Sequence, residues 1–147
     1  MGAQWPLVVG RLLVLLPTLP GWSNVTIFDG PPVTADVAAD YVTVGYVADD
    51  TGGTYVQVQT PDGFRCEETG TVRSQLSSVT GDTDLASVRT RVFALIDQVQ
   101  AAVRADRRLG VLSPEGTTEL DVDVLSLQNS GGAAQSVVFT LHYLTIT

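Results

Sequence analysis

The sequence predicts an α+β fold in which a mixed, mostly antiparallel sheet is packed by an N-terminal helix and one long central helix, with an extended β-hairpin. Two observations carry this prediction. Segments with strand-like alternation outnumber segments with helical periodicity, and the two kinds do not alternate regularly as they would in a doubly wound fold. The 147 residues are 44% apolar, which is enough for one hydrophobic core, so we expect a single domain over residues 1–147.

The first predicted helix covers the apolar run Leu7–Leu16. Its leucines and valines recur at helical spacing and leave Arg11 on the other side, and Pro17 ends the helix. The run is well short of the ~20 apolar residues that cross a bilayer, and it lacks the basic start and cleavage site of a signal peptide. We therefore expect an amphipathic helix and no membrane association.

Four strand-like segments precede the central helix. Asn24–Phe28 is β-branched and aromatic, and it stops at the turn Asp29–Pro32. Tyr41–Val47 is apolar at nearly every position, which indicates burial on both faces. Thr54–Thr60 alternates cleanly before the turn at Pro61–Gly63, and the polar segment Phe64–Thr80 reads as an extended strand or hairpin with at least one irregularity.

The central helix is the clearest element of the sequence. Asp82 or Thr83 can cap its start, three arginines crowd its last turn, and Gly110 provides the stop. One apolar stripe recurs at three- and four-residue steps and should face the sheet: Leu85, Val88, Val92, Leu95, Ile96, Val99 and Val103.

Two more strands complete the predicted fold. In Glu119–Val124 the acids share one face, and the phase then slips at Leu125, which indicates a β-bulge. A turn at Gly131-Gly132 leads to Ser136–Thr147, which is apolar on both faces and therefore expected to be central in the sheet.

Composition argues against several functional classes. Sixteen acidic residues against eight arginines, with no lysine, give a net charge of −8, which does not favour binding to nucleic acid phosphates. The single cysteine, Cys66, excludes an intrachain disulfide and a cysteine-based zinc site. No phosphate-binding loop and no nucleophile-base motif is present, so we expect no enzymatic activity and no cofactor or metal.

Four features in order along the chain carry a resemblance to a known family. They are the apolar first helix followed by a strand and Asp29-Gly30-Pro31-Pro32, the strand with Val44-Gly45, the helix from Gly81-Asp82-Thr83-Asp84 to Arg107-Arg108-Leu109-Gly110, and the hairpin from Gly131-Gly132 to Phe139-Thr140-Leu141-His142-Tyr143. With these features, which span most of the chain, the sequence resembles the tail terminator proteins of long-tailed bacteriophages, the group that includes the lambda minor tail protein U type.

The resemblance implies a structural virion protein. Such proteins form a ring, typically a hexamer, on the head-proximal end of the tail tube. The ring stops tube polymerisation, contacts the neck proteins and lets the genome pass through its lumen. The implied partners are further copies of the chain, the tail tube protein and a neck protein, and the implied location is the virion, after assembly in the host cytoplasm.

The family supplies no catalytic residues, so candidate assembly residues follow from expected exposure. We expect Asp49–Gly53 and Asp62–Gly70 to be loops that reach the tube or a neighbouring subunit. The candidate assembly and lumen acids are Asp49, Asp50, Asp62, Glu67 and Glu68.

Two other readings of the sequence stay open. A head-completion or stopper protein of the neck has similar size and also forms a ring, and position along the tail axis would distinguish it. A small ligand-binding or enzyme domain of cellular origin would instead be a monomer with a concave pocket lined by converging polar groups.

Overall fold

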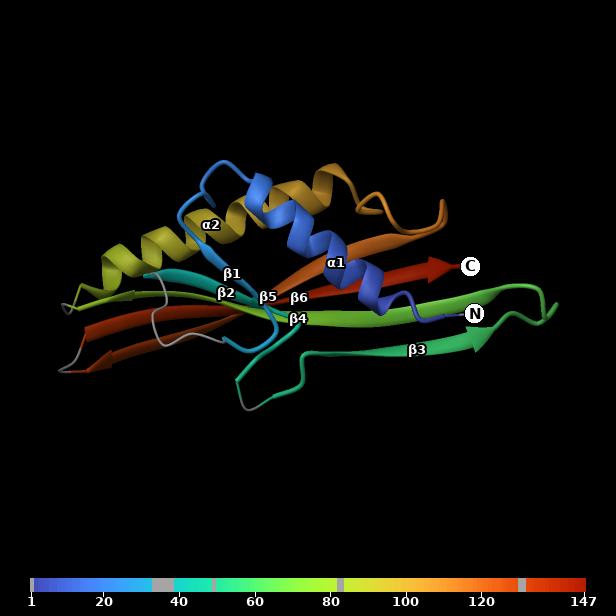
Figure 1. Cartoon of the computed structure of the whole chain (residues 1–147), viewed down its shortest axis with the longest axis horizontal. Coiled ribbons are helices and arrows are strands. Elements are labelled where there is room, and N and C mark those ends of the chain that lie inside the picture. Colours follow the sequence, from blue (N-terminus) through green and yellow to red (C-terminus); the bar gives the residue numbers. More distant parts are fainter. Residues whose placement is uncertain (1, 33–38, 49, 82–83, 130–131) are drawn as a thin grey trace.

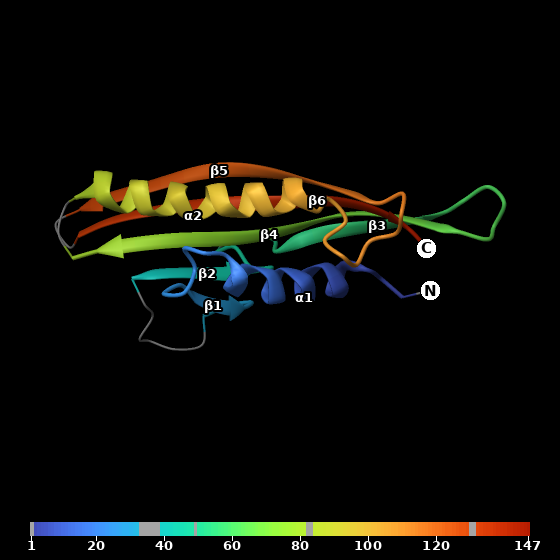
Figure 2. The same cartoon turned by 90° about the horizontal axis from the view of Figure 1, so that it is seen from above.

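Two α-helices lie side by side on one face of a mixed sheet (Figures 1 and 2). The computed structural model describes residues 2–32, 39–48, 50–81, 84–129 and 132–147. Within them the elements are α1 (Trp5–Leu15), a 3-10 turn η1 (Leu16–Thr18), β1 (Thr26–Asp29), β2 (Asp40–Val44), β3 (Gly53–Gln59), β4 (Cys66–Thr80), α2 (Leu85–Ala105), β5 (Thr117–Asn129) and β6 (Gly132–Ile146).

The six described strands form one sheet, and five of them follow the order β1-β2-β4-β6-β5. Only β1 and β2 are parallel, and every other pair is antiparallel. The remaining strand, β3, pairs with the first half of β4 at residues 66–72, along the same edge that β2 uses at residues 75–78. The predicted α+β fold with a mostly antiparallel sheet is confirmed, and β6 is central, between β4 and β5.

The long helix α2 follows the predicted pattern closely. Its start is capped by the Asp84 side chain, which accepts a hydrogen bond from the Ser87 amide at 3.1 Å, whereas the predicted caps Asp82 and Thr83 lie outside the described residues. The buried side chains are Val88, Val92, Leu95, Ile96, Val99 and Val103, which confirms the stripe except at Leu85, which is half-buried at the start of the helix. The helix ends at Ala105, where Asp106 leaves the helical conformation (φ −139°, ψ 89°), so the predicted stop at Gly110 is wrong. Of the three arginines predicted for the last turn, only Arg104 lies in it.

The first helix is rotated slightly from its predicted orientation. Leu7 is exposed rather than buried, and Val9 joins Val8 and Leu12 in the core instead. Arg11 is half-buried, and its Nε donates a hydrogen bond to the Leu109 carbonyl at 2.7 Å. This bond ties α1 to the segment that follows α2.

Two predicted irregularities are wrong. The pairing of β4 with β6 runs without interruption from Glu67↔Ile146 to Thr80↔Ala133, so β4 is one strand of 15 residues. The pairing of β5 with β6 is equally regular and contains no bulge at Leu125. The physical reason is shared, because both helices cover the same face of the sheet. The 52% exposed Leu125 lies on the uncovered face, where apolar periodicity is not required, and on the covered face β4 buries polar residues such as Glu68 and Ser74 beside Val72.

The second strand is shorter than predicted. Val42, Thr43 and Val44 are buried as expected, but β2 ends at Val44 because Gly45 adopts a left-handed conformation (φ +70°) that turns the chain away.

The hydrophobic core fills the space between the helices and the covered face. α2 packs on β4, β5 and β6, and α1 packs on β2 and β4. The indole of Trp22 is buried against α2, and its Nε1 donates to the Leu95 carbonyl at 3.2 Å.

Candidate assembly surface

The β3–β4 hairpin projects from one end of the molecule, past both chain termini (Figure 2). Every residue of β3 after Gly53 is exposed, including Val56 and Val58 at 59% each. The strand carries no charged residue and no proline, the features that normally protect a sheet edge from pairing with another chain. An exposed, apolar, unprotected edge strand is typical of a surface that another protein covers.

The turn of this hairpin is held by a network of hydrogen bonds. The Thr60 amide donates to the Arg65 carbonyl at 2.8 Å, and the Gly63 amide donates to the Thr60 carbonyl at 2.9 Å. The Asp62 carboxylate accepts from the Thr60 hydroxyl and from the Phe64 amide, and these bonds hold the pKa of Asp62 below its usual range. The result is an ordered turn that presents the Phe64 ring, 87% exposed, to solvent.

Glu68 lies at the base of the hairpin and is 1% exposed, so its prediction as an exposed lumen acid is wrong. It belongs to β4, where strand alternation turns its side chain toward the helices. Its carboxylate accepts hydrogen bonds from the Gln4 amide at 3.0 Å, from Gln57 Nε2 at 2.9 Å and from the Tyr143 hydroxyl at 2.6 Å. Glu68 therefore holds the start of α1, β3 and β6 together.

This arrangement changes the acidity of the Tyr143 phenol. Burial of the phenol raises the pKa of Tyr143 far above its ordinary value, and the neighbouring Glu68 carboxylate raises it further. The hydroxyl therefore remains a proton donor to Glu68 at all physiological pH values.

The other candidate acids do not gather at one place. Asp50 is exposed and pairs with Arg73 at 2.7 Å, which lowers the pKa of Asp50. Glu67 is exposed on β4, six residues and therefore roughly 20 Å along the strand from Arg73. Asp62 lies at the hairpin turn, and Asp49 lies outside the described residues. The segment from Cys66 to Gly70 is strand and not the predicted loop.

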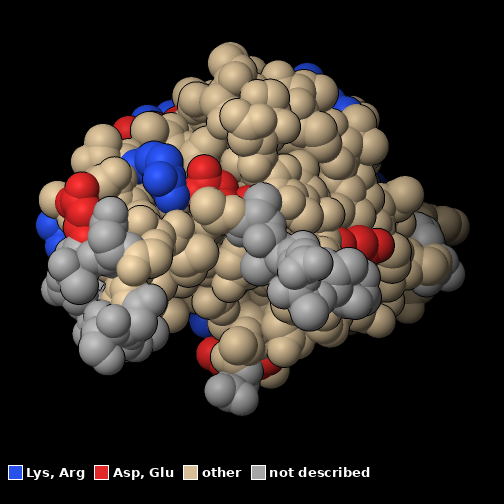
Figure 3. All heavy atoms as spheres, turned by 60° about the vertical axis from the view of Figure 1, so that its left-hand side comes forward, with Lys and Arg blue, Asp and Glu red and all other residues tan. Residues whose placement is uncertain are grey.

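The uncovered face of the sheet is mixed in character. β5 presents Glu119, Asp121 and Asp123 on this face, and Asp121 lies 2.7 Å from His142 Nε2 on β6. Apolar side chains lie on the same face at both ends of the sheet: Val56 and Val58 in the hairpin, and Leu125 near the far end of β5. On the view of the molecule in Figure 3, charged side chains are likewise scattered among uncharged residues.

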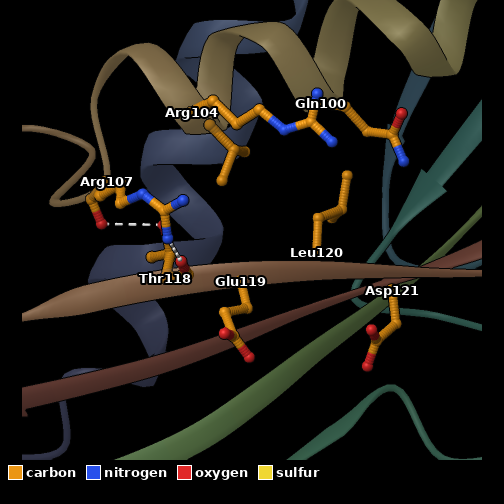
Figure 4. A pocket seen from close by; sticks show the side chains of 8 residues that line it. Gln100, Arg104, Arg107, Thr118, Glu119, Leu120 and Asp121 are labelled. Atoms are coloured by element: carbon orange, nitrogen blue, oxygen red, sulfur yellow. Dashed lines mark hydrogen bonds between the residues drawn. The ribbon is translucent and has the colours of Figure 1, made fainter.

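A groove of about 290 Å³ runs between the last turns of α2 and the first residues of β5 (Figure 4). Val103 and Leu120 form its apolar part, and Gln100, Arg104 and Arg107 line the helix side. Leu120 points toward α2, whereas Glu119 and Asp121 point to the other side of the strand (Figure 4). The charge on the helix side of the groove is therefore positive, whereas Glu119 and Asp121, which also line the groove, belong to its strand side.

The two groove arginines are not used in ion pairs among the described residues. Arg65, Arg73 and Arg91 pair with Glu115, Asp50 and Asp40 respectively. Arg107 instead donates from Nη1 to the Thr118 carbonyl at 3.5 Å, and the Thr118 hydroxyl donates to the Arg107 carbonyl at 2.8 Å. No hydrogen bond of the Arg104 side chain occurs within the part of the chain that the structure describes.

Sequence reasoning missed this groove. The arginines at the end of α2 were explained by the helix dipole alone. The missing information was tertiary, because only the packing of α2 on β5 brings Leu120 beneath Arg104 and Arg107.

The described residues show no arrangement for catalysis by the single cysteine and histidine. His142 pairs with Thr71 across the β4–β6 ladder, five residues and roughly 17 Å along β4 from Cys66. Across the described ranges, no group of three His, Cys, Asp or Glu side chains could hold a metal ion. Nor is any described helix both long and apolar enough to cross a membrane.

Comparison with known proteins adds no relative. No protein-family model matches the chain, and no curated protein sequence matches it at a significant level. A functional proposal therefore rests on the sequence pattern and on the surface geometry.

Proposed function

We propose that this chain is a structural virion protein of a long-tailed bacteriophage. It forms a ring, with six copies as the expected number, that caps the head-proximal end of the tail tube, ends tube polymerisation and joins the tail to the neck. The protein performs no catalysis and needs no cofactor in this role.

The observation that carries the proposal is the β3–β4 hairpin. It extends beyond the helical layer, leaves Val56 and Val58 in solvent and ends in the exposed Phe64. A stable monomer gains nothing by exposing apolar groups on a projecting arm, whereas an assembling subunit uses them to contact a neighbour. The resemblance of the sequence to tail terminators supports further copies of the chain and the tail tube as the neighbours that the hairpin contacts.

Two further properties suit a ring through which DNA passes. The uncovered face of the sheet offers each subunit a second surface for the tube or the neck. The charge of −8 per copy repels DNA, which favours passage without adhesion.

The test is a tube-capping experiment. The tail tube protein encoded by the same genome is polymerised with and without this protein, and tube lengths are measured by electron microscopy. We expect shorter tubes, each with a ring at one end. Unchanged tube lengths without bound rings would contradict the proposal.

Localisation in intact virions distinguishes a terminator from a head-completion or stopper protein. Antibody labelling at the tail end of isolated tails supports the terminator, because tails assemble separately from heads in this reading. Label found only on isolated heads would assign the protein to the neck.

A further inference from the structure

The molecule carries a projecting knob and a fitting groove on different parts of its surface, and the proposed ring gives them a use. Building on that proposed function, we propose that the hairpin turn of one copy, with Phe64 and Asp62, inserts into the groove between α2 and β5 of the next copy. The ring would then close through this contact.

The knob is ordered before it binds. Its backbone turn is closed by hydrogen bonds between Thr60, Gly63 and Arg65, and Arg65 Nη2 is further tied to Glu115 at 2.8 Å. An ordered turn loses little conformational entropy when it docks. A projecting aromatic ring on such a turn has the properties of an interface hot spot.

The groove matches both chemical parts of the knob. The half-buried Leu120 offers apolar contact to a ring, and a cavity of roughly 150 Å³ already holds benzene, so a groove of about 290 Å³ has room for a phenyl group. Arg104 and Arg107 can lie against the ring face and pair with the Asp62 carboxylate. The knob therefore supplies an apolar group for Leu120 and a negative charge for the two arginines.

The hairpin turn and the groove of the same molecule cannot touch each other. Leu120 pairs with Leu141, and Leu141 pairs with Val72, so the groove lies level with Val72 of β4. Phe64 is eight residues before Val72, roughly 26 Å further along the strand direction, and the hairpin points away from α2 (Figures 1 and 2). The contact must be between copies, and because it joins two different surfaces it is head-to-tail, the kind that closes into rings.

The helix dipole alone does not account for this site. It favours cations in the last turn of α2, but it gives no reason for an open groove with an apolar floor beneath them. Arg65, Arg73 and Arg91 pair with carboxylates elsewhere on the surface, whereas Arg104 and Arg107 face the groove.

Disulfide trapping tests the contact directly. In a Cys66→Ser background, Pro61→Cys on the turn is combined with Gln100→Cys in the groove, which leaves Phe64, Asp62 and both arginines intact. Under mild oxidation we expect a ladder of covalent oligomers on a non-reducing gel that ends at the ring size. The matched control combines Pro61→Cys with Arg89→Cys, which lies on the same helix roughly 16 Å from Gln100.

The contribution of each group is measured in the trapping background. Phe64→Ala, Asp62→Asn and Arg107→Gln should each slow the formation of covalent oligomers roughly fivefold or more. Arg89→Gln and Asp97→Asn, which lie outside the groove, should leave the rate unchanged.

Three outcomes would overturn the contact: no oligomers, a ladder equal to that of the control pair, or a product that stops at the dimer. If electron microscopy shows capped tubes or rings while trapping fails, the proposed function stands and only this contact is wrong. If trapping succeeds but no tube is capped, the contact stands and the proposed function fails.

Discussion

At the scale of single residues, the most consequential side chain is Glu68, because it organises three elements from a buried position. Among the described residues its carboxylate has no arginine partner, and it is satisfied by amide and hydroxyl donors from the start of α1, from β3 and from β6. A buried carboxylate is tolerated only when such donors surround it, and removal of an acceptor leaves them unpaired.

Glu68→Gln tests this arrangement. The amide places N–H groups opposite donors that now need an acceptor, so the free energy of unfolding should fall by about 1–3 kcal/mol. The adjacent Glu67→Gln is the matched control and should stay within about 0.5 kcal/mol of the native protein. Urea denaturation followed by circular dichroism measures both, and equal stabilities of the two variants would contradict the role of Glu68.

The hairpin turn makes a prediction about pH. Hydrogen bonds from Thr60 and from the Phe64 amide hold the pKa of Asp62 below 3.8, so ionised Asp62 favours the folded turn above that pH and this contribution is lost as the pH falls through the lowered pKa. Thr60→Val removes the leading cause and should move the NMR titration midpoint of Asp62 up toward 3.8.

Arg65→Gln is the comparison for this titration. Arg65 acts on Asp62 only as a minor charge effect, so its replacement should move the midpoint less than Thr60→Val does. A larger shift in the arginine variant would mean that charge, and not hydrogen bonding, orders the turn.

At the scale of elements, α2 is the scaffold of the core. Its stripe is buried from Val88 to Val103, and Val92 is completely inaccessible to solvent. The matched positions on its outer side, such as Ala94, are exposed.

Val92→Asp should abolish cooperative folding. An unpaired charge in the core costs about 3–5 kcal/mol or more, which is comparable to the whole stability of many domains. Ala94→Asp on the exposed side should fold normally. A soluble Val92→Asp protein with a cooperative thermal transition would show that the core is assigned wrongly.

The two glycines Gly10 and Gly70 should respond to alanine with opposite signs. Gly10 lies inside α1 with open space around it, so Gly10→Ala should raise the free energy of unfolding by about 0.5–1 kcal/mol. A Cβ at Gly70 would lie 2.5 Å from the Tyr143 hydroxyl oxygen, so Gly70→Ala should cost about 1–3 kcal/mol. Thermal denaturation of both variants checks the signs.

At the scale of the whole molecule, the helices cover one face of the sheet and leave the other face and the hairpin uncovered (Figure 1). An antiparallel sheet commonly has one packed face and one solvated face, so the feature that goes beyond this architecture is the projecting hairpin with exposed Val56, Val58 and Phe64. It suits a subunit of a larger assembly.

The lumen hypothesis is also tested at this scale. With Glu68 excluded by its burial, Asp50→Asn and Glu67→Gln together remove two exposed negative charges per subunit. In the proposed ring, virions should assemble normally but eject DNA more slowly, because the repulsion between lumen and DNA is weaker. Unchanged ejection kinetics, measured by fluorescence of released DNA, would retire the hypothesis.

Much of the fold could be predicted from local pattern. The stripe of α2 and the alternation of β3 and β5 are encoded by residues close together in sequence, and both appear where they were predicted. The errors fall at Leu125 and in β4, where regular strands carry residues of unexpected polarity, on the outer face of α1 at Leu7 and at the end of β2. Alternation shows that neighbours face opposite sides of a sheet, but it does not show which side the helices cover.

The candidate site could be predicted far less well. Exposed acids were expected from loop-like composition, yet Glu68 is buried, because only the register of β3, β4 and β6 turns its side chain toward Tyr143 and Gln4. The groove with Arg104 and Arg107 had no local signal, since its floor comes from a strand that follows in the sequence and its wall from a helix.

The sequence by itself determined the kinds of elements, their order and the α+β class, because periodicity and turn residues act over short stretches of chain. Only the tertiary structure decided the covered face, the reach of the hairpin, the burial of Glu68 and the position of the positive groove. Those properties depend on which distant segments pack together, because apolar burial is shared between residues that lie far apart in the sequence.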